Sequence, residues 1–563
     1  MVASQEIKHS IPAYELVADQ LVKAGVECIF GVLGEDIASV VNAAVARGIV
    51  YYPARHENHA VSMADGYARA TGRIGVAAVT GGPGFTNALT AIYTSHLASS
   101  PILVLTGAGR AEEDDRDPDV VKLATGPTWL KHFPQASVLK EIGIETVKPL
   151  TPEAASRDAA EALALARGRP VVLVLGIWLL LQKVATSKEQ IPVVTGKEPS
   201  PLPDPAKIAE VADFLQETWA VKQPLVIAGR GAMLSGAGPT LQKLASQIGA
   251  LLATSLPARG LFGDDPFSVG VCGSYSTSVA TDLITQADCV LAFGAGLNPW
   301  TTYRNSLFPK ALIIQVDSDP SAIGRFLPAA IGVEGDVKAV AEALVSELER
   351  RGHKSDGYRN SRTQDAIVSF RKDAEIVDRS TPTLVDPRTM MLALDRMLPI
   401  GRILCVDSGQ QARFAIRYIS TTRPQNLIQA ADFGSIGLGF GTAIGAQIGR
   451  PGELVVCPVG DGAAMMSLGD LESIVRLRLP ILVVVSNDES YGAEVNALTN
   501  LGLDTTLANT PCPSFEAMAI AMGARAATVR TIDDLEVIEA WLGDNGGVPL
   551  VLDCRVNPAV RAE

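Results

Sequence analysis

Short runs of apolar residues alternate with longer segments of helical periodicity along most of the chain. Residues 14–24 and 35–46 place apolar side chains at the spacing of an amphipathic helix, whereas residues 28–32 form a continuous apolar run with the length of a buried strand. Further strand-like runs occupy residues 75–79, 102–106 and 171–175. This alternation predicts βα units built around a parallel sheet.

The alternation restarts twice, which divides the chain into three blocks. We predict a first domain over residues 1–183, a central domain over 205–350 and a third domain over 386–563. The linkers would be residues 184–204, which contain proline and serine, and residues 351–385, which are rich in charge. A chain of 563 residues is too long for one hydrophobic core. The expected fold class is therefore α/β, with three domains, each a doubly wound, mostly parallel sheet flanked by helices.

The overall charge excludes some classes of partner. The chain has 48 basic and 61 acidic side chains, which gives a net charge of -13. A chain with this balance has no general attraction for nucleic acid or for an anionic membrane surface. A phosphate-bearing ligand would therefore need a local site made of backbone amides or a bound cation.

The cysteines and the apolar stretches indicate the cellular compartment of the protein. The seven cysteines are scattered without a Cys-x-x-Cys pair, so we expect buried, reduced thiols. The N-terminus lacks the basic-then-apolar order of a signal peptide. The longest apolar stretch, residues 170–181, is too short to cross a bilayer and predicts a buried strand. A cytoplasmic location is the resulting expectation.

The clearest candidate ligand site lies in the third block. A strand-like run over residues 454–458 leads into Gly-Asp-Gly at 460–462, and a second run over 481–485 ends in Asn-Asp-Glu-Ser at 487–490. Polar groups at the carboxyl ends of parallel strands converge in one crevice. Glycines beside Asp461 let a phosphate approach the backbone, and oxygen ligands around a phosphate suit Mg2+. The pattern therefore predicts a magnesium-assisted site for a phosphorylated ligand.

This arrangement resembles the fingerprint of thiamine-diphosphate enzymes, in which Gly-Asp-Gly precedes an Asn-containing turn. The resemblance implies that Asp461, a side chain at residue 487 or 488, and the backbone carbonyl of Ser490 hold Mg2+ against the diphosphate. Counting without gaps favours Asp488 as the second ligand, while Asn487 stays open because Asn-Asn is commoner in the family. The implied cofactor-binding residues here are Gly460, Asp461, Gly462, Ala463, Asp488, Ser490, Tyr491 and Gly492.

The first block carries a second part of the resemblance. Residues 53–72 contain His-Glu before Ala-Asp-Gly-Tyr-Ala-Arg and look like the family's pyrimidine-binding segment. There a glutamate, here Glu57, drives the imino tautomer of the cofactor's aminopyrimidine, which takes the thiazolium proton. The Gly-Gly-Pro-Gly turn at residues 81–84 resembles the family's turn beside the cofactor or substrate. It implies contacts from Gly82, Pro83 and Asn87.

Other residues would shape the reacting centre. The stretch with Gly434, Ser435 and Ile436 resembles the segment that holds the cofactor bent. In that segment a carbonyl, here of Gly434, accepts from the aminopyrimidine, and an apolar side chain, here Ile436, lies between the two rings. Glu494 and Glu35 fall near acids that handle protons in pyruvate decarboxylases, although the adjacent His-His pair of those enzymes has no counterpart in this chain.

The central block resembles the family's central domain, with Gly-Arg-Gly at residues 229–231. FAD-carrying acetohydroxyacid synthases have an Arg-Phe-Asp-Asp-Arg run after the strand that here ends at residues 294–296, and this chain has none. FAD is therefore not supported, although it is not excluded. The first strand is not followed by Gly-x-Gly-x-x-Gly, which argues against a nicotinamide-dependent dehydrogenase.

The resemblance to the acetohydroxyacid (acetolactate) synthase and pyruvate decarboxylase group covers nearly the whole chain. It implies decarboxylation of a 2-oxo acid such as pyruvate, with thiamine diphosphate and Mg2+, followed by carboligation to a second carbonyl. Gln135 resembles the glutamine of a Phe-Gln pair in acetohydroxyacid synthases and would orient the acceptor. Two subunits share each cofactor in this family, so Glu57 and Asp461 are expected to meet in a homodimer or homotetramer.

Three alternatives stay open at this point. A C–C lyase acting on a 2-hydroxy ketone or a 2-hydroxyacyl thioester would use the same site in reverse. A simple 2-oxo acid decarboxylase would release an aldehyde, but the missing His pair argues against it. From a different class, a catalytically silent regulatory subunit would bind the cofactor only. Glu57 argues against such a subunit, because binding alone does not need that carboxylate.

Overall fold

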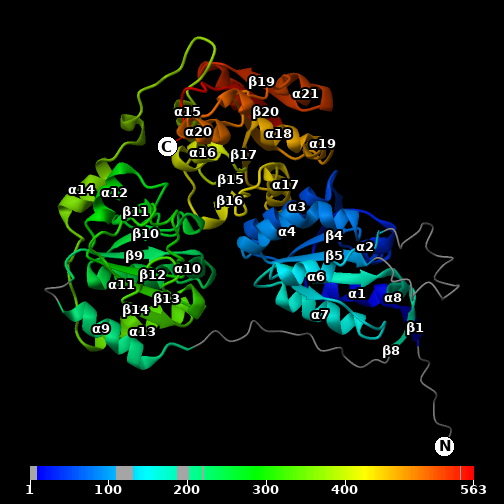
Figure 1. The fold of residues 1–563 in the computed structure, drawn as a ribbon, viewed down its shortest axis with the longest axis horizontal. Coiled ribbons are helices and arrows are strands. Elements are labelled where there is room, and N and C mark those ends of the chain that lie inside the picture. Colours follow the sequence, from blue (N-terminus) through cyan, green and yellow to red (C-terminus); the bar gives the residue numbers. More distant parts are fainter. Residues whose placement is uncertain (1–8, 109–130, 187–201, 218–220, 545–546, 563) are drawn as a thin grey trace, which may run out of the picture.

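The computed structural model describes residues 9–108, 131–186, 202–217, 221–544 and 547–562. Within these ranges the strands form three six-stranded sheets, one in each predicted block, and a two-stranded ribbon of β1 (His9–Pro12) and β8 (Lys183–Thr186) (Figure 1). Every strand pair inside the three sheets is parallel, so the predicted fold class is confirmed. The domain boundaries stay predictions, and residues 187–201 of the first predicted linker lie outside the described residues.

The first sheet has the strand order β3-β2-β4-β5-β7-β6, with buried apolar clusters on both faces. Its strands are β2 (Cys28–Val32), β3 (Val50–Pro53), β4 (Gly75–Val79), β5 (Ile102–Ala108), β6 (Glu145–Val147) and β7 (Val171–Gly176). Its helices are α1 (Ala13–Lys23), α2 (Glu35–Ala46), α3 (Glu57–Thr71), α4 (Pro83–Leu97), α6 (Gln135–Glu141), α7 (Ala155–Leu165) and α8 (Ile177–Leu181). The predicted strand over 28–32 and helix over 35–46 are confirmed.

One expectation for this domain is wrong. The apolar stretch over residues 170–181 is a strand only as far as Gly176, and residues 177–181 form the short helix α8. In the described residues the pairing of β7 with β5 reaches Gly176 opposite Ala108, and the buried Leu179 and Leu180 of α8 continue the apolar cluster that contains Leu173 and Leu175. An apolar run therefore spans two elements, because both are buried.

The central sheet has the order β11-β10-β9-β12-β13-β14. Its strands are β9 (Pro224–Ala228), β10 (Leu251–Thr254), β11 (Ser268–Val271), β12 (Cys289–Phe293), β13 (Leu312–Asp317) and β14 (Ile331–Glu334). Its helices are α9 (Pro205–Gln216), α10 (Arg230–Leu234), α11 (Gly238–Ile248), α12 (Ser278–Thr285) and α13 (Val337–Arg350). The second predicted linker contains a further helix, α14 (Ser361–Ser369), and the buried Tyr358 just before it donates a hydrogen bond to the carbonyl of Leu283 at 2.9 Å. This part of the linker thus packs on the central domain.

The third sheet has the order β16-β15-β17-β18-β20-β19, which repeats the order of the first sheet when strands are counted along the chain. Its strands are β15 (Ile403–Val406), β16 (Leu427–Gln429), β17 (Val455–Gly460), β18 (Ile481–Asn487), β19 (Arg525–Val529) and β20 (Leu550–Arg555). Its helices are α15 (Pro387–Met397), α16 (Gln410–Tyr418), α17 (Gly439–Gly449), α18 (Asp461–Met466), α19 (Leu468–Arg476), α20 (Gly492–Leu501), α21 (Phe515–Met522) and α22 (Val537–Gly543). After Gly-Asp-Gly the chain forms two helices, α18 and α19, divided at Ser467.

Helices α3 and α17 join the first and third domains (Figure 1). Each follows the second strand of its sheet, so equivalent elements of two similar folds face one another. Their backbones touch through glycine: a Cβ at Gly66 would lie 2.0 Å from the carbonyl oxygen of Thr442, and one at Gly445 would lie 1.8 Å from that of Met63. Only residues without a side chain permit this approach.

We expect Gly445→Ala to destabilise the protein by about 3 kcal/mol, although alanine is the better helix former, because its Cβ has no space against a backbone carbonyl. The matched control is Gly452→Ala, since a Cβ at Gly452 meets nothing within 4 Å. This control should change stability by less than about 0.5 kcal/mol. The urea midpoint of the first unfolding transition measures both effects, and equal midpoints would contradict the expectation.

The three domains meet at Asp432. Its carboxylate pairs with Arg69 of α3 at 3.3 Å and with Arg230 of α10 at 3.4 Å. Arg230 also donates to the carbonyl of Leu97 at 2.8 Å. The arginine of the Gly-Arg-Gly motif therefore ties the central domain to a loop that leads into residue 434.

The remaining expectations about the bulk of the protein concern thiols and membranes. All seven cysteines are unpaired in the structure; six are buried, as expected, and Cys512 is partly buried. In the described part of the chain, no helix combines the length and the apolar character needed to span a bilayer.

Candidate active site

The candidate site lies at the carboxyl end of the third sheet. From β15 the chain turns to β16 on one side and then continues at β17 on the other, so the ends of β15 and β17 flank the crevice where ligands bind in such sheets. A cavity of about 500 Å³ opens there, within the usual size of a cofactor pocket. Its lining includes the predicted residues Gly434, Ser435, Ile436, Gly460, Asp461, Gly462, Ala463, Asp488, Ser490, Tyr491, Gly492 and Glu494.

Asp461 is the first residue of α18 and stands directly after β17. Its Oδ1 accepts a hydrogen bond from the backbone N–H of Gly462 at 2.8 Å, whereas its Oδ2 is buried and has no partner. Burial, reinforced by the negative charge of Asp488, raises the pKa of Asp461 to about 7. A buried oxygen without a donor beside a second carboxylate suits a bound cation.

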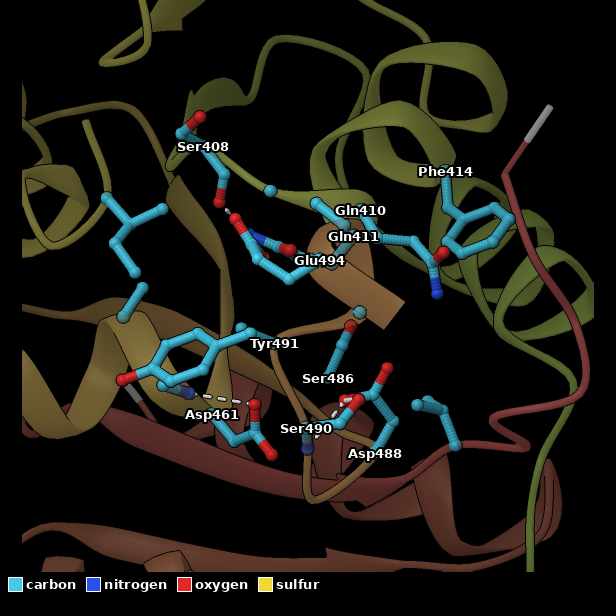
Figure 2. A pocket seen from close by; sticks show the side chains of 18 of the residues that line it. Ser408, Gln410, Gln411, Phe414, Asp461, Ser486, Asp488, Ser490, Tyr491 and Glu494 are labelled. Carbon is cyan, nitrogen blue, oxygen red and sulfur yellow. Dashed lines mark hydrogen bonds between the residues drawn. The ribbon is translucent and has the colours of Figure 1, made fainter. Parts of the chain in front are cut away.

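Register explains why the two carboxylates meet. Strands β17 and β18 are neighbours, and Gly460 pairs with Ser486, so the residues after each strand emerge side by side. Asp488 accepts from Ser490 through both its backbone N–H at 3.1 Å and its hydroxyl at 3.0 Å. Figure 2 shows Asp461, Ser490 and Asp488 on one side of the cavity. The described residues hold no cluster of three or more His, Cys, Asp and Glu side chains suited to a metal, so carbonyl and phosphate oxygens would have to complete a magnesium shell.

The geometry favours Asp488 over Asn487 as the second ligand. Asn487 is 2% exposed and does not line the cavity. Its Nδ2 donates to Oδ1 of the buried Asp553 at 2.9 Å, and its Oδ1 accepts from the backbone of Glu489 at 3.3 Å. The amide of Asn487 is thus used inside the fold, while Asp488 faces the cavity.

This difference gives a pair of contrasting variants. Asp488→Ala should raise the Mg2+ concentration for half-maximal cofactor binding at least about tenfold, because it removes a ligand. Asn487→Ala should leave that concentration unchanged but lower the stability by about 2 kcal/mol, because Asp553 loses a buried donor. Calorimetric titration with Mg2+ and urea denaturation measure the two effects, and the opposite pattern would make Asn487 the ligand.

The segment around Ile436 is held from behind by Asp407, the residue after β15. Its fully buried carboxylate accepts from the backbone of Gly437 at 3.0 Å, of Gly439 at 2.8 Å and of Ser408 at 2.6 Å. Burial raises the pKa of Asp407 to about 6, against the effect of these donors. In front of this anchor, Ile436 lines the cavity, and the buried Ser435 hydroxyl beside it has no partner. An unpaired hydroxyl at this point fits a polar ligand such as the expected cofactor.

Sequence reasoning missed part of the cavity wall. Ser408, Gln410 and Gln411 follow β15 and line the cavity together with Glu494 of α20, across from the two carboxylates (Figure 2). The apolar run over residues 403–406 could have identified these residues. Residues after a strand that borders the point where the strand order reverses are candidates for the wall of a ligand site. The placement of Glu494 agrees with the role expected for it, which stays a prediction.

The first-domain candidates form a separate group. Glu57 is the first residue of α3, and its Oε2 accepts from Nδ2 of Asn87 on α4 at 3.0 Å. Gly82 adopts φ +65° at the start of α4 and Pro83 is the first residue of that helix. A Cβ at Gly84 would lie 3.2 Å from Oε1 of Glu57, so the Gly-Gly-Pro-Gly turn and the glutamate are in contact.

Within one chain, Glu57 does not reach the cavity that Asp461 faces. The cavity is lined from the first domain by Asn58 and Thr90, and not by Glu57. The structure of one chain therefore separates the two halves that the resemblance assigns to one cofactor.

Gln135 and Glu35 both lie at the carboxyl end of the first sheet. Gln135 is buried, its Nε2 donates to the carbonyl of Gly107 at 2.8 Å and its Oε1 accepts from Thr106 at 3.2 Å. Both ends of this amide are used on β5, which supports a positioning role more than direct contact with an acceptor. Glu35 lies at the start of α2, with Nζ of Lys131 at 3.9 Å.

Asp36, beside Glu35, is a residue that the sequence did not single out. It is buried and accepts from Thr80 Oγ1 at 2.7 Å and from the backbone of Gly81 at 2.8 Å. Its carboxylate also fills the space where a side chain at Gly107 would stand. Asp36 thus fixes the turn that carries Gly82.

Comparison with known protein families agrees with this geometry. Residues 12–136 match the N-terminal thiamine pyrophosphate binding domain of thiamine pyrophosphate enzymes, residues 208–344 match their central domain, and residues 407–554 match their C-terminal thiamine pyrophosphate binding domain. The chain belongs to the thiamine pyrophosphate enzyme family, and it is a thiamine-diphosphate-dependent enzyme.

Individual relatives fall in the group that the motifs indicated. The chain is 26% identical to the probable acetolactate synthase large subunit of Methanococcus aeolicus, over 96% of this chain and 92% of the relative. It is 27% identical to the corresponding protein of Methanocaldococcus jannaschii over the same shares. It is 28% identical to the acetolactate synthase isozyme 2 large subunit of Escherichia coli, over 93% of this chain and 92% of the relative.

Proposed function

We propose that this protein decarboxylates a 2-oxo acid such as pyruvate, with thiamine diphosphate and Mg2+, and joins the remaining fragment to a second carbonyl compound in the cytoplasm. The observation that carries the proposal is the cavity in which Asp461 and Asp488 face the same space as Ile436 and Glu494. Asp461 and Asp488 supply an anchor for a metal-bound diphosphate. Ile436 supplies an apolar contact, and Glu494 supplies an acid that can handle a proton. Acetolactate synthase large subunits among the relatives support the carboligating outcome.

The roles of the residues follow from their chemistry. Asp461 and Asp488, with the carbonyl of Ser490, would hold Mg2+ and through it the diphosphate. Thiamine diphosphate, when bound, supplies the carbon nucleophile that attacks the 2-oxo acid and takes up the electron pair when CO2 leaves. Ile436 would keep the two rings of the cofactor apart in a bent shape. Glu494 would give or take a proton at the reacting carbon.

The first domain would complete the site from a second subunit. Glu57 would hydrogen-bond the pyrimidine ring and hold the proton there, with Asn87 fixing its carboxylate. The turn that contains Gly82 and Pro83 would lie against the cofactor or the acceptor. In this proposal the smallest active unit is a homodimer, and a homotetramer would contain the same contact twice.

The experiment that tests the proposal is CO2 release from a panel of 2-oxo acids, with and without thiamine diphosphate and Mg2+, followed by mass identification of the products. A 2-hydroxy-2-alkyl 3-oxo acid or an acyloin would support carboligation, and an aldehyde alone would reduce the function to decarboxylation. No release by protein that binds the cofactor would overturn the proposal. The next substrates to test would then be 2-hydroxy ketones and 2-hydroxyacyl thioesters.

A further inference from the structure

A buried histidine, His59, connects three segments of the candidate site. It is the third residue of α3, two positions after Glu57, and is 6% exposed. Its Nε2 lies 2.7 Å from the carbonyl oxygen of Gly437, the residue after Ile436. Its Nδ1 forms an ion pair with Asp470 of α19, the helix that follows α18. One ring therefore joins the helix that begins at Glu57, the segment that carries Ile436 and the helix that follows the one beginning at Asp461.

The partner of this ring is a carboxylate that the third domain buries against the first. Asp470 is 0% exposed, and its Oδ1 accepts from the backbone N–H of Arg55 at 3.3 Å and from Oγ of Ser473 at 2.9 Å. Its Oδ2 faces His59. A buried carboxylate is stable when it is paired with a cation, and the cationic group in contact with it here is the imidazole.

The two contacts of the ring determine its protonation. Nε2 meets a carbonyl and Nδ1 meets a carboxylate, and both of these groups accept hydrogen bonds only. A proton on each ring nitrogen therefore suits both contacts. Burial alone would lower the pKa of His59, but the contacts with Asp470 and Gly437 and the negative charge of Asp407 outweigh burial and raise it. The exposed ring of His56 also lies beside it, with the two ring centroids 5.8 Å apart, and the positive charge of Arg55 acts on Asp470.

Gly437 is held from both sides by these groups. Its N–H donates to Asp407 at 3.0 Å, while its carbonyl faces His59. Gly437 adopts φ +86°, in the left-handed region that favours glycine. Ile436, the residue before it, therefore lies outside any regular helix or strand. The orientation of Ile436 therefore depends on these two hydrogen bonds.

We propose that His59 is a positioning residue: a buried imidazolium that fixes the Gly437 carbonyl against Asp470 and so sets Ile436 relative to the helix that begins at Glu57. The inference rests on the proposed function, because Ile436 has a role only if the cofactor binds beside it. When the ring loses a proton, one of its two contacts becomes a repulsion between acceptors. The positioning is therefore complete at low pH and is lost as the pH rises through the raised pKa.

The variant Asp470→Asn tests this role without emptying the interface, because asparagine keeps the shape and an oxygen for Arg55 and Ser473 while removing the charge. The amide nitrogen that replaces Oδ2 is a donor facing Nδ1, so it suits the neutral ring and repels the imidazolium. We therefore expect the dissociation constant for thiamine diphosphate of this variant, divided by that of the wild-type protein and measured by calorimetry in Mg2+, to rise about tenfold as the pH falls from about 8 to about 6. Both proteins carry Asp461, whose pKa of about 7 makes Mg2+ binding itself depend on pH, and the ratio removes this shared effect. His353→Gln, in the central domain, is the control and should follow the wild type.

Histidine-selective ¹⁵N NMR observes the ring itself, since the chain has six histidines. One of them should titrate above the ordinary range of a histidine, should titrate at lower pH in Asp470→Asn, and should be missing from His59→Gln/Asp470→Asn. A wild-type protein that fails to bind the cofactor would overturn the proposed function as well as this inference. A wild-type protein that binds, with Asp470→Asn following it at every pH, would overturn the role of His59 alone.

Discussion

Glu57→Gln should slow deuterium exchange of the thiazolium hydrogen of bound thiamine diphosphate by about 10²- to 10⁴-fold, the usual contribution of a positioned acid or base. The side chain stands at the first position of α3 and accepts from Asn87 at 3.0 Å. Glutamine keeps the size of the side chain and an oxygen for Asn87, but it loses the negative charge that favours a protonated pyrimidine nitrogen. Acid-quenched NMR of the cofactor after timed mixing with D2O measures the rate.

Two controls separate this role of Glu57 from a loss of cofactor binding and from a general effect of removing a negative charge. The dissociation constant for thiamine diphosphate should change less than about threefold in Glu57→Gln, because the diphosphate is held elsewhere. Glu141→Gln, at the exposed end of α6, should exchange at the wild-type rate. Unchanged exchange in Glu57→Gln with the cofactor bound would remove Glu57 from the proposed role and would revive the interpretation as a silent binding subunit.

Motifs that are local in sequence were the predictable part of the site. Gly-Asp-Gly and the turn after residue 486 lie at the ends of two neighbouring apolar runs, so their convergence followed from parallel pairing alone. Glu57 was found instead from the His-Glu motif, and it stands at the start of α3. The strands that precede Asp461 and Asp488 are visible from their apolar runs, whereas β3, which precedes Glu57, has only exposed and partly buried residues.

The rest of the site depends on contacts between distant parts of the chain. The pairing of His59 with Asp470 joins residues 411 positions apart, and Asp36 meets Gly81 from another strand end. Nothing in the neighbourhood of either residue marks it, because a buried ion pair is defined by its partner. The short helix over 177–181 was missed for a related reason, since burial removes the period that distinguishes helix from strand.

Subunits carrying Glu57→Gln and subunits carrying Asp461→Asn should each be inactive alone, yet together they should regain about one quarter of the wild-type activity in a random mixture of symmetric dimers. The reason is geometric: the cavity that Asp461 faces takes Asn58 and Thr90 from its own chain but not Glu57. If each site uses Glu57 of one subunit and Asp461 of its partner, half the dimers are mixed. One of the two sites in each mixed dimer then has both native residues.

The reciprocal mixture is the matched control. Wild-type subunits mixed with equal amounts of a chain carrying both substitutions should fall to about one quarter of the activity, because each site of a mixed dimer then lacks one native residue. Sites contained within single chains would give the opposite result: no recovery for the two single variants and about one half for the double variant mixed with wild type. CO2 release after co-expression with two different affinity tags measures both mixtures. The two arrangements of the site therefore differ in both mixtures, whichever 2-oxo acid proves to be the substrate.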